Sequence, residues 1–147
     1  MNLAEPVFIH CRGNPGELAL AAPGSEFNVV SYARLGRFIN NVCGRIIALG
    51  FTPGMRIAVF IEDPIVHAVV VLSLTRLGIV SISGRTKDFS WRFPIDAVFA
   101  DKPHSFRAPK IVLVDPHWTT GDGKEIDGKH IHRGLPDEVC RIILTSG

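Results

Sequence analysis

Apolar residues recur at three- and four-residue intervals between Ser31 and Leu49, and this spacing predicts an amphipathic helix. The opposite face carries arginines such as Arg34 and Arg37, so one side of the helix meets solvent. Ser31 can cap the start of the helix, and Gly50 follows its end, where a left-handed residue is favoured. Together these signals predict a helix whose apolar face packs on the core.

A nearly continuous apolar run at residues 56–61 is typical of a strand covered on both faces. Asp63 and Pro64 then provide an N-cap and a first helical residue, and the apolar segment 65–77 predicts a buried helix. Residues 79–82 predict the next strand. A strand, a helix and a strand joined by short turns form a right-handed crossover unit, which predicts a parallel sheet.

Three further apolar runs, at residues 96–100, 111–114 and 141–144, predict additional strands. The polar segment 119–132 contains three glycines and predicts a surface loop or a hairpin. The alternation of strands and helices predicts the α/β class, with a parallel sheet in a three-layer sandwich that has helices on both faces.

Residues 1–30 are rich in proline and glycine and are predicted to form an irregular lead-in. Residues 31–147 are then expected to form one α/β subdomain. A chain of 147 residues that is 46% hydrophobic is large and apolar enough to bury a core of its own.

Charge and cysteine content exclude several classes of protein. The 16 basic and 14 acidic residues nearly balance, so no nucleic-acid partner is predicted. Cys11, Cys43 and Cys140 form no CxxC pair, which argues against a disulfide framework and fits a reducing cytoplasm. The N-terminus lacks the pattern of a secretory signal, and charged residues interrupt the longest apolar stretch, so no membrane span is expected.

The histidines and cysteines of the sequence do not form a recognisable metal-binding or catalytic motif. His130 and His132 lack a third ligand at a diagnostic spacing, so they are interpreted as solvated loop residues and no metal site is predicted. His67 lies among apolar residues and is expected to be a core histidine bound to a backbone group. Cys140 is expected to pack structurally, since no base lies at a recognisable spacing from it.

A dinucleotide-binding domain is the obvious α/β alternative, but it requires a Gly-x-Gly-x-x-Gly turn after the first strand. The turn here contains Glu62 and Asp63, whose carboxylates would repel a pyrophosphate.

Four segments, taken in order, match sequence patterns of one enzyme family. Residues 31–35 resemble a Thr-Tyr-x-x-Leu helix start, and residues 48–59 resemble a Leu-Gly-Val-x-x-Gly-Asp-x-Val-Ala stretch. Residues 74–82 are similar to an apolar helix that ends in glycine before the next strand. Residues 141–147 resemble the strand that enters a Thr-Ser-Gly-Thr-Thr-Gly-x-Pro-Lys-Gly loop. On these segments the chain resembles the N-terminal part of an AMP-dependent acyl-CoA synthetase, from the adenylate-forming superfamily.

This resemblance implies a two-step reaction, in which a carboxylic acid and ATP form an acyl-AMP and a thiol then accepts the acyl group. ATP and Mg²⁺ are the implied cofactors, and coenzyme A or a carrier-protein thiol is the implied acceptor. Thr145, Ser146 and Gly147 match the start of the family's phosphate-binding loop, after a buried strand. The family's adenine-binding, ribose-binding and catalytic-lysine motifs have no match in this chain, so no catalytic residue is predicted.

The resemblance covers only the opening part of such an enzyme, so the chain alone is expected to show no ATP–pyrophosphate exchange and no tight ATP binding. A sheet that ends near residue 144 is expected to leave an apolar edge or face uncovered, through which the chain can self-associate. The acid, the thiol acceptor and the nature of the end at Gly147 stay open. A non-catalytic α/β binding or interface module is the alternative function.

Overall fold

The fold is built on a sheet of five parallel strands. A computed structural model of the protein describes residues 2–83, 94–103, 108–135 and 137–143. The strand order is β6-β5-β3-β4-β7, and every neighbouring pair is parallel, so the predicted parallel sheet is confirmed. The strands are β3 (Arg56–Phe60), β4 (Val80–Ser83), β5 (Ala97–Ala100), β6 (Ile111–Leu113) and β7 (Arg141–Ile143).

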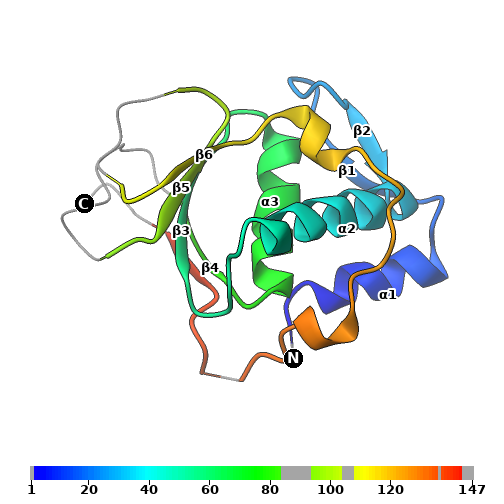
Figure 1. Ribbon diagram of the computed structural model, residues 1–147. Coiled ribbons are helices and arrows are strands. Elements are labelled where there is room, and N and C mark those ends of the chain that lie inside the picture. The colour runs from blue at the N-terminus through cyan, green and yellow to red at the C-terminus, as the bar shows by residue number, and fades with distance from the viewer. Residues whose placement is uncertain (1, 84–93, 104–107, 136, 144–147) are drawn as a thin grey trace.

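Helices accompany this sheet, which confirms the predicted α/β class. Figure 1 shows α2 (Tyr32–Ala48) and α3 (Pro64–Arg76) to one side of the sheet, with α3 passing behind α2. Within the described part of the chain, all the α-helices belong to the layers on this side. The opposite face of the sheet carries a second, smaller apolar cluster. It contains Ala58, Ile82, Ile95, Val98 and Ala100.

The predicted helix signals of α2 are confirmed. The Ser31 side chain accepts a hydrogen bond from the Arg34 backbone N–H at 3.3 Å, which caps the start of the helix. Gly50, just past its end, has a φ of 84°, the left-handed conformation that glycine adopts without strain. The apolar stripe of α2, which includes Ile39 and Ile46, is fully buried against the core.

The prediction of an irregular lead-in at residues 1–30 is wrong. This segment forms α1 (Glu5–Gly13) and an antiparallel pair of strands, β1 (Leu18–Ala21) and β2 (Val29–Ser31). Proline in the first turn of α1 is compatible with a helix, because the N–H that it lacks has no partner there anyway. Phe8 and Val30 are buried in the same core as α2 and α3, so tertiary packing overrides the turn-rich composition.

The polar segment at residues 119–132 is a loop rather than a hairpin, with short 3₁₀ turns at η1 (Pro116–Thr119) and η2 (Gly128–His130). Two asparagines of α2 fasten it. Asn40 donates to the Gly123 carbonyl at 3.1 Å, and Asn41 exchanges two hydrogen bonds with the loop.

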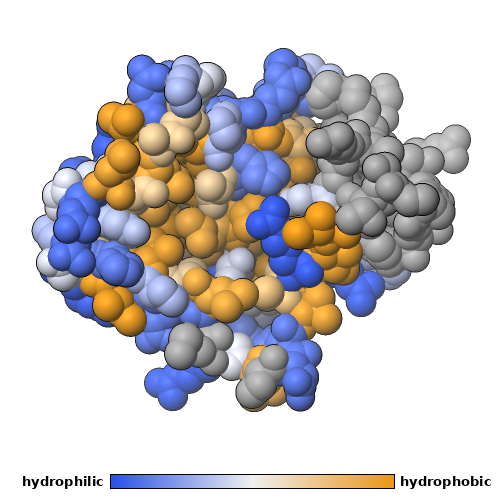
Figure 2. Space-filling model, turned by 180° about the vertical axis from the view of Figure 1, so that it is seen from behind, coloured by the Kyte–Doolittle hydropathy of each residue, from blue (hydrophilic) through white to orange (hydrophobic). Residues whose placement is uncertain are grey.

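A broad apolar area covers the face of the molecule that Figure 2 shows, on the side of α3 away from α2. In α3, Val71 is buried and Leu72 is half-buried. The expectation that the sheet leaves an apolar edge or face uncovered, through which the chain can self-associate, stays a prediction. None of the described helices is long and apolar enough to cross a bilayer.

Candidate functional site

The candidate site lies at the carboxyl end of the parallel sheet, where the loops that follow parallel strands converge. Thr145, Ser146 and Gly147, the predicted phosphate-binding residues, lie outside the described residues. The strand that leads to them is described. β7 pairs with β4 in parallel register, with Ser83 opposite Ile143, so the described part of β7 ends beside the end of β4.

The start of α3 forms one wall of this end of the sheet. The Asp63 carboxylate accepts hydrogen bonds from the backbone N–H groups of Ile65 and Val66, at 2.9 and 3.0 Å, as the predicted N-cap. It also accepts from the Ser25 hydroxyl at 2.8 Å and from the Glu26 backbone N–H at 3.0 Å. Burial raises the pKa of Asp63, but these hydrogen bonds outweigh it and hold the pKa below its ordinary value.

A group of polar side chains lies along the paired strands β4 and β7, with Arg141 as the first residue of β7 and Ser83 as the last of β4. Arg141 Nη2 donates to Ser83 Oγ at 3.4 Å, across the two paired strands. Ser81, opposite Arg141 in the register, is fully buried, and its hydroxyl has no hydrogen-bond partner among the described residues. Arg141 and the half-buried Ser83 hydroxyl provide donors that suit an anionic ligand, whereas the Ser81 hydroxyl is enclosed in the fold.

His67, in the first turns of α3, faces the same region. Burial lowers the pKa of its imidazole, and the charge of Arg141 lowers it further despite a contact with a backbone carbonyl. Its Nδ1 lies 3.3 Å from the Ile61 carbonyl oxygen. The predicted contact of His67 with a backbone group is confirmed, whereas the residue is half-buried and does not belong to the buried core.

The acidic side chains of the turn after β3 bind other groups of the protein. Lys102 Nζ lies 2.5 Å from Glu62 Oε2, and the Glu62 backbone N–H donates to the Asp101 carboxylate at 2.7 Å. Asp63 is committed to the helix start and to Ser25. The turn therefore serves to position α3, and it does not have the glycine-rich form that a dinucleotide-binding site requires.

The remaining sequence candidates are dispersed. All three cysteines are free, and burial raises the pKa of Cys43 to about 12, so that thiol is inert. The interpretation of His132 as a solvated loop residue is wrong, since it is half-buried and its Nε2 lies 2.8 Å from the Glu138 carboxylate. Within the described ranges, no three His, Cys, Asp or Glu side chains converge on a possible metal site.

Sequence reasoning missed the grouping of Ser81, Ser83 and Arg141. The three residues belong to two strands about sixty positions apart, and only the parallel register brings them together. A serine at every second position of a strand is a weak signal, because alternation alone does not tell which face meets a ligand.

No family model matches the sequence, and no curated protein matches it. Similarity appears in solved structures. The N-terminal subdomain of NpsA from Klebsiella oxytoca aligns with 99% of this chain at a TM-score of 0.76 and 14% identity, and the chain covers 39% of it. A fatty acyl CoA synthetase of Mycobacterium tuberculosis aligns with 99% of the chain, at a TM-score of 0.72 and 16% identity, with 32% of its own length covered.

A third similar structure is a long-chain-fatty-acid-CoA ligase, FadD1, from Archaeoglobus fulgidus. It aligns with 97% of the chain at a TM-score of 0.76 and 12% identity, and 34% of it is covered. The chain therefore has the fold of the N-terminal part of these proteins and spans less than half of their length.

Proposed function

We propose that this chain is the N-terminal α/β portion of an ATP-dependent, adenylate-forming acid–thiol ligase. The parent enzyme would activate a carboxylic acid as an acyl-AMP and transfer it to coenzyme A or to a carrier-protein thiol. The observation that carries the proposal is the position of β7, which lies in parallel beside β4 as far as Ile143. In the sequence, Leu144 and then Thr145, Ser146 and Gly147 follow this strand.

Support also comes from the similar structures. Nearly the whole chain aligns with an acyl-CoA synthetase and with NpsA, and one NpsA structure is a complex with 3-hydroxybenzoyl-AMSN. VinN, which aligns with the chain at a TM-score of 0.74, is known in a complex with L-aspartate. Ligands of these kinds are consistent with a carboxylic acid as substrate.

The described residues fit a phosphate-bearing ligand. Arg141 and Ser83 offer donors at the end of β4, where Arg141 Nη2 reaches the Ser83 hydroxyl. Thr145, Ser146 and the backbone of Gly147 are proposed to hold the β- and γ-phosphates of ATP. Bound Mg²⁺ would neutralise charge that develops on those phosphates. Burial lowers the pKa of the His67 imidazole, which disfavours its charged form beside Arg141.

The first test is the reading frame beyond Gly147. A frame that continues as Thr-Thr-Gly-x-Pro-Lys supports the proposal, and a stop codon there favours the non-catalytic α/β binding or interface module instead. The polypeptide that includes the continuation is then assayed for ATP–pyrophosphate exchange with a panel of carboxylic acids. Residues 1–147 alone are expected to show no exchange and no tight binding of ATP.

Variants of the extended polypeptide test the assigned residues. Ser146→Ala is expected to lower the exchange rate about 10²-fold, because it removes a donor to charge that develops in the transition state. Thr52→Ala, an exposed hydroxyl in the turn before β3, is the matched control and should leave the rate unchanged. Exchange by residues 1–147 alone, or equal effects of the two variants, would contradict the proposal.

A further inference from the structure

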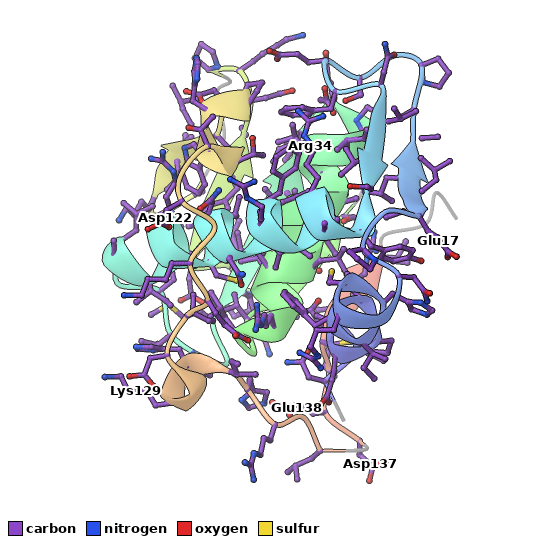
Figure 3. The ribbon with its side chains drawn as sticks, turned by 90° about the vertical axis from the view of Figure 1, so that its right-hand side faces the viewer. Glu17, Arg34, Asp122, Lys129, Asp137 and Glu138 are labelled. Carbon is purple, nitrogen blue, oxygen red and sulfur yellow. The ribbon has the colours of Figure 1, made fainter. Side chains whose placement is uncertain are left out.

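A second hollow, the Arg76 pocket, lies at the other end of α3, away from the carboxyl ends of the strands. It has a volume of about 550 Å³, within the range of small-molecule sites. Figure 3 shows this end of the molecule at the bottom of the view, with Lys129 of η2 at the lower left and Glu138 below α1. Its lining includes Glu5, Phe8, Arg12, Arg76, Glu125 and Arg133.

Arg76 is the deepest charged group of the pocket. Its guanidinium carbon lies 3.6 Å from the centre of the Phe8 ring, and its Nη1 donates to Asn40 Oδ1 at 2.5 Å. Only 4% of the residue is exposed. A buried guanidinium is costly unless a carboxylate or another anion compensates its charge.

The compensation that Arg76 receives is weak. Its ion-pair partner among the described residues is Glu125, at 3.3 Å, and the Glu125 side chain is 64% exposed. The neighbouring thiols of Cys11 and Cys43 add no charge, because burial raises the pKa of both. The C-terminal end of α3 contributes only the partial negative charge of a helix end.

Two more arginines line the pocket. Arg12 and Arg133 are exposed, and neither forms an ion pair within the described part of the chain. Nearby acidic groups have other partners, since Glu138 binds His132 and Asp127 binds Lys129. If Glu125 swings out, the three guanidinium groups face Glu5 alone, which leaves two positive charges uncompensated.

We propose that the Arg76 pocket binds a small dianion, a phosphate monoester or a short dicarboxylate, whose acidic group replaces the Glu125 carboxylate on Arg76. Glu125 occupies the place of the ligand, and its exposure lets it leave. Arg12 and Arg133 bind the outer part of the ligand. The site is separate from the proposed nucleotide site, so either proposal can fail without the other.

The experiment titrates the 147-residue chain with inorganic phosphate or succinate at constant ionic strength. Arginine Nε–H and backbone amide signals are followed by NMR. Saturable shifts are expected at Arg12, Arg76, Arg133 and Gly128, with a dissociation constant of about 1 mM or below. Saturation by one probe alone identifies which of the two anion classes binds, and no saturation by either probe overturns the proposal.

Variants at the rim avoid the risk that a change at Arg76 prevents folding. The double variant Arg12→Gln/Arg133→Gln is expected to weaken binding about tenfold or more, since it removes two charged donors. Arg34→Gln/Arg37→Gln, with the same charge change on the exposed face of α2, is the control and should have little effect. Equal losses in the two double variants would indicate general attraction to a basic protein and overturn the proposal.

Glu125→Gln separates ligand binding from a purely structural ion pair. Removing the competing carboxylate is expected to tighten binding about fivefold. Glu17→Gln makes the same charge change on a side chain that Figure 3 shows across the molecule from Lys129, and it should not alter affinity. If Glu125→Gln weakens binding or matches Glu17→Gln, Glu125 does not occupy a ligand position.

Discussion

The two ends of α3 are held by different kinds of contact. At its start, Asp63 accepts hydrogen bonds from the backbone two and three residues further on, so the cap and the helix belong to one short stretch of sequence. At its end, Asn2 donates to the carbonyl oxygens of Thr75, Arg76 and His132, at 3.0, 3.1 and 2.8 Å. That clamp joins three parts of the chain that are far apart in sequence.

The two proposed sites lie at opposite ends of α3, so they differ in the kind of contact that shapes them. The start of α3 is held mainly by a local cap, which can form as soon as the helix does, and hydrogen bonds from Ser25 and Glu26 to the same carboxylate are added when the fold closes. The end that carries Arg76 takes its shape only when α1 and the segment around His132 close over it. The nucleotide end is therefore expected to be less sensitive to long-range changes than the Arg76 pocket.

The largest effect is expected for Asn2→Ala. The side chain is buried, and its loss leaves backbone carbonyls of α3 and of residue 132 without their donor. We expect the free energy of unfolding, measured by urea denaturation, to fall by about 2–3 kcal/mol. Asn14→Ala, an exposed asparagine after α1, should change it by less than about 0.5 kcal/mol. Similar losses in both variants would show that the clamp is not specific.

A smaller loss is expected for Asp63→Ala at the other end. The change removes the N-cap of α3 and the contact with Ser25, and it should cost about 1–2 kcal/mol in the same assay. Asp137→Ala is the control, because Figure 3 shows this carboxylate pointing away from the molecule. A loss at Asp63 larger than that at Asn2 would reverse the comparison between the two ends.

The smallest effect is a dependence on pH. Because the pKa of Asp63 in the folded state lies below its ordinary value of 3.8, its carboxylate stabilises the fold at neutral pH. This contribution is fully present above about pH 4 and is lost as the pH falls through the folded-state pKa. The difference in unfolding free energy between the wild type and Asp63→Asn should shrink below about pH 4. A constant difference from pH 7 to pH 3 would show that the charge of Asp63 does not matter.

Much of the fold was predictable because its signals are local. The Ser31 cap, the left-handed Gly50 and the Asp63 cap each act within a few residues, and the structure has all three. The helix α1 was missed because the proline and glycine content of residues 1–30 predicts turns. Its stability comes from Phe8, which packs into a core made by residues much later in the chain.

The candidate sites were less predictable. The grouping of Arg141 with Ser83 depends on which strands become neighbours, and the sequence carries no direct record of that order. Arg76 carries no distinguishing signal in the sequence, and the structure buries it on the Phe8 ring. Burial of a single charged side chain is decided by segments that close over it, so periodicity cannot reveal it.

By itself the sequence determined the α/β class, the caps of α2 and α3, and the resemblance of residues 141–147 to a phosphate-loop entrance. These depend on residue periodicity and on hydrogen bonds between near neighbours along the chain. The tertiary structure alone decided the strand order, the helical nature of α1 and the assembly of the Arg76 pocket. Each requires contacts between distant segments, whose formation is governed by packing of the whole core rather than by any local pattern.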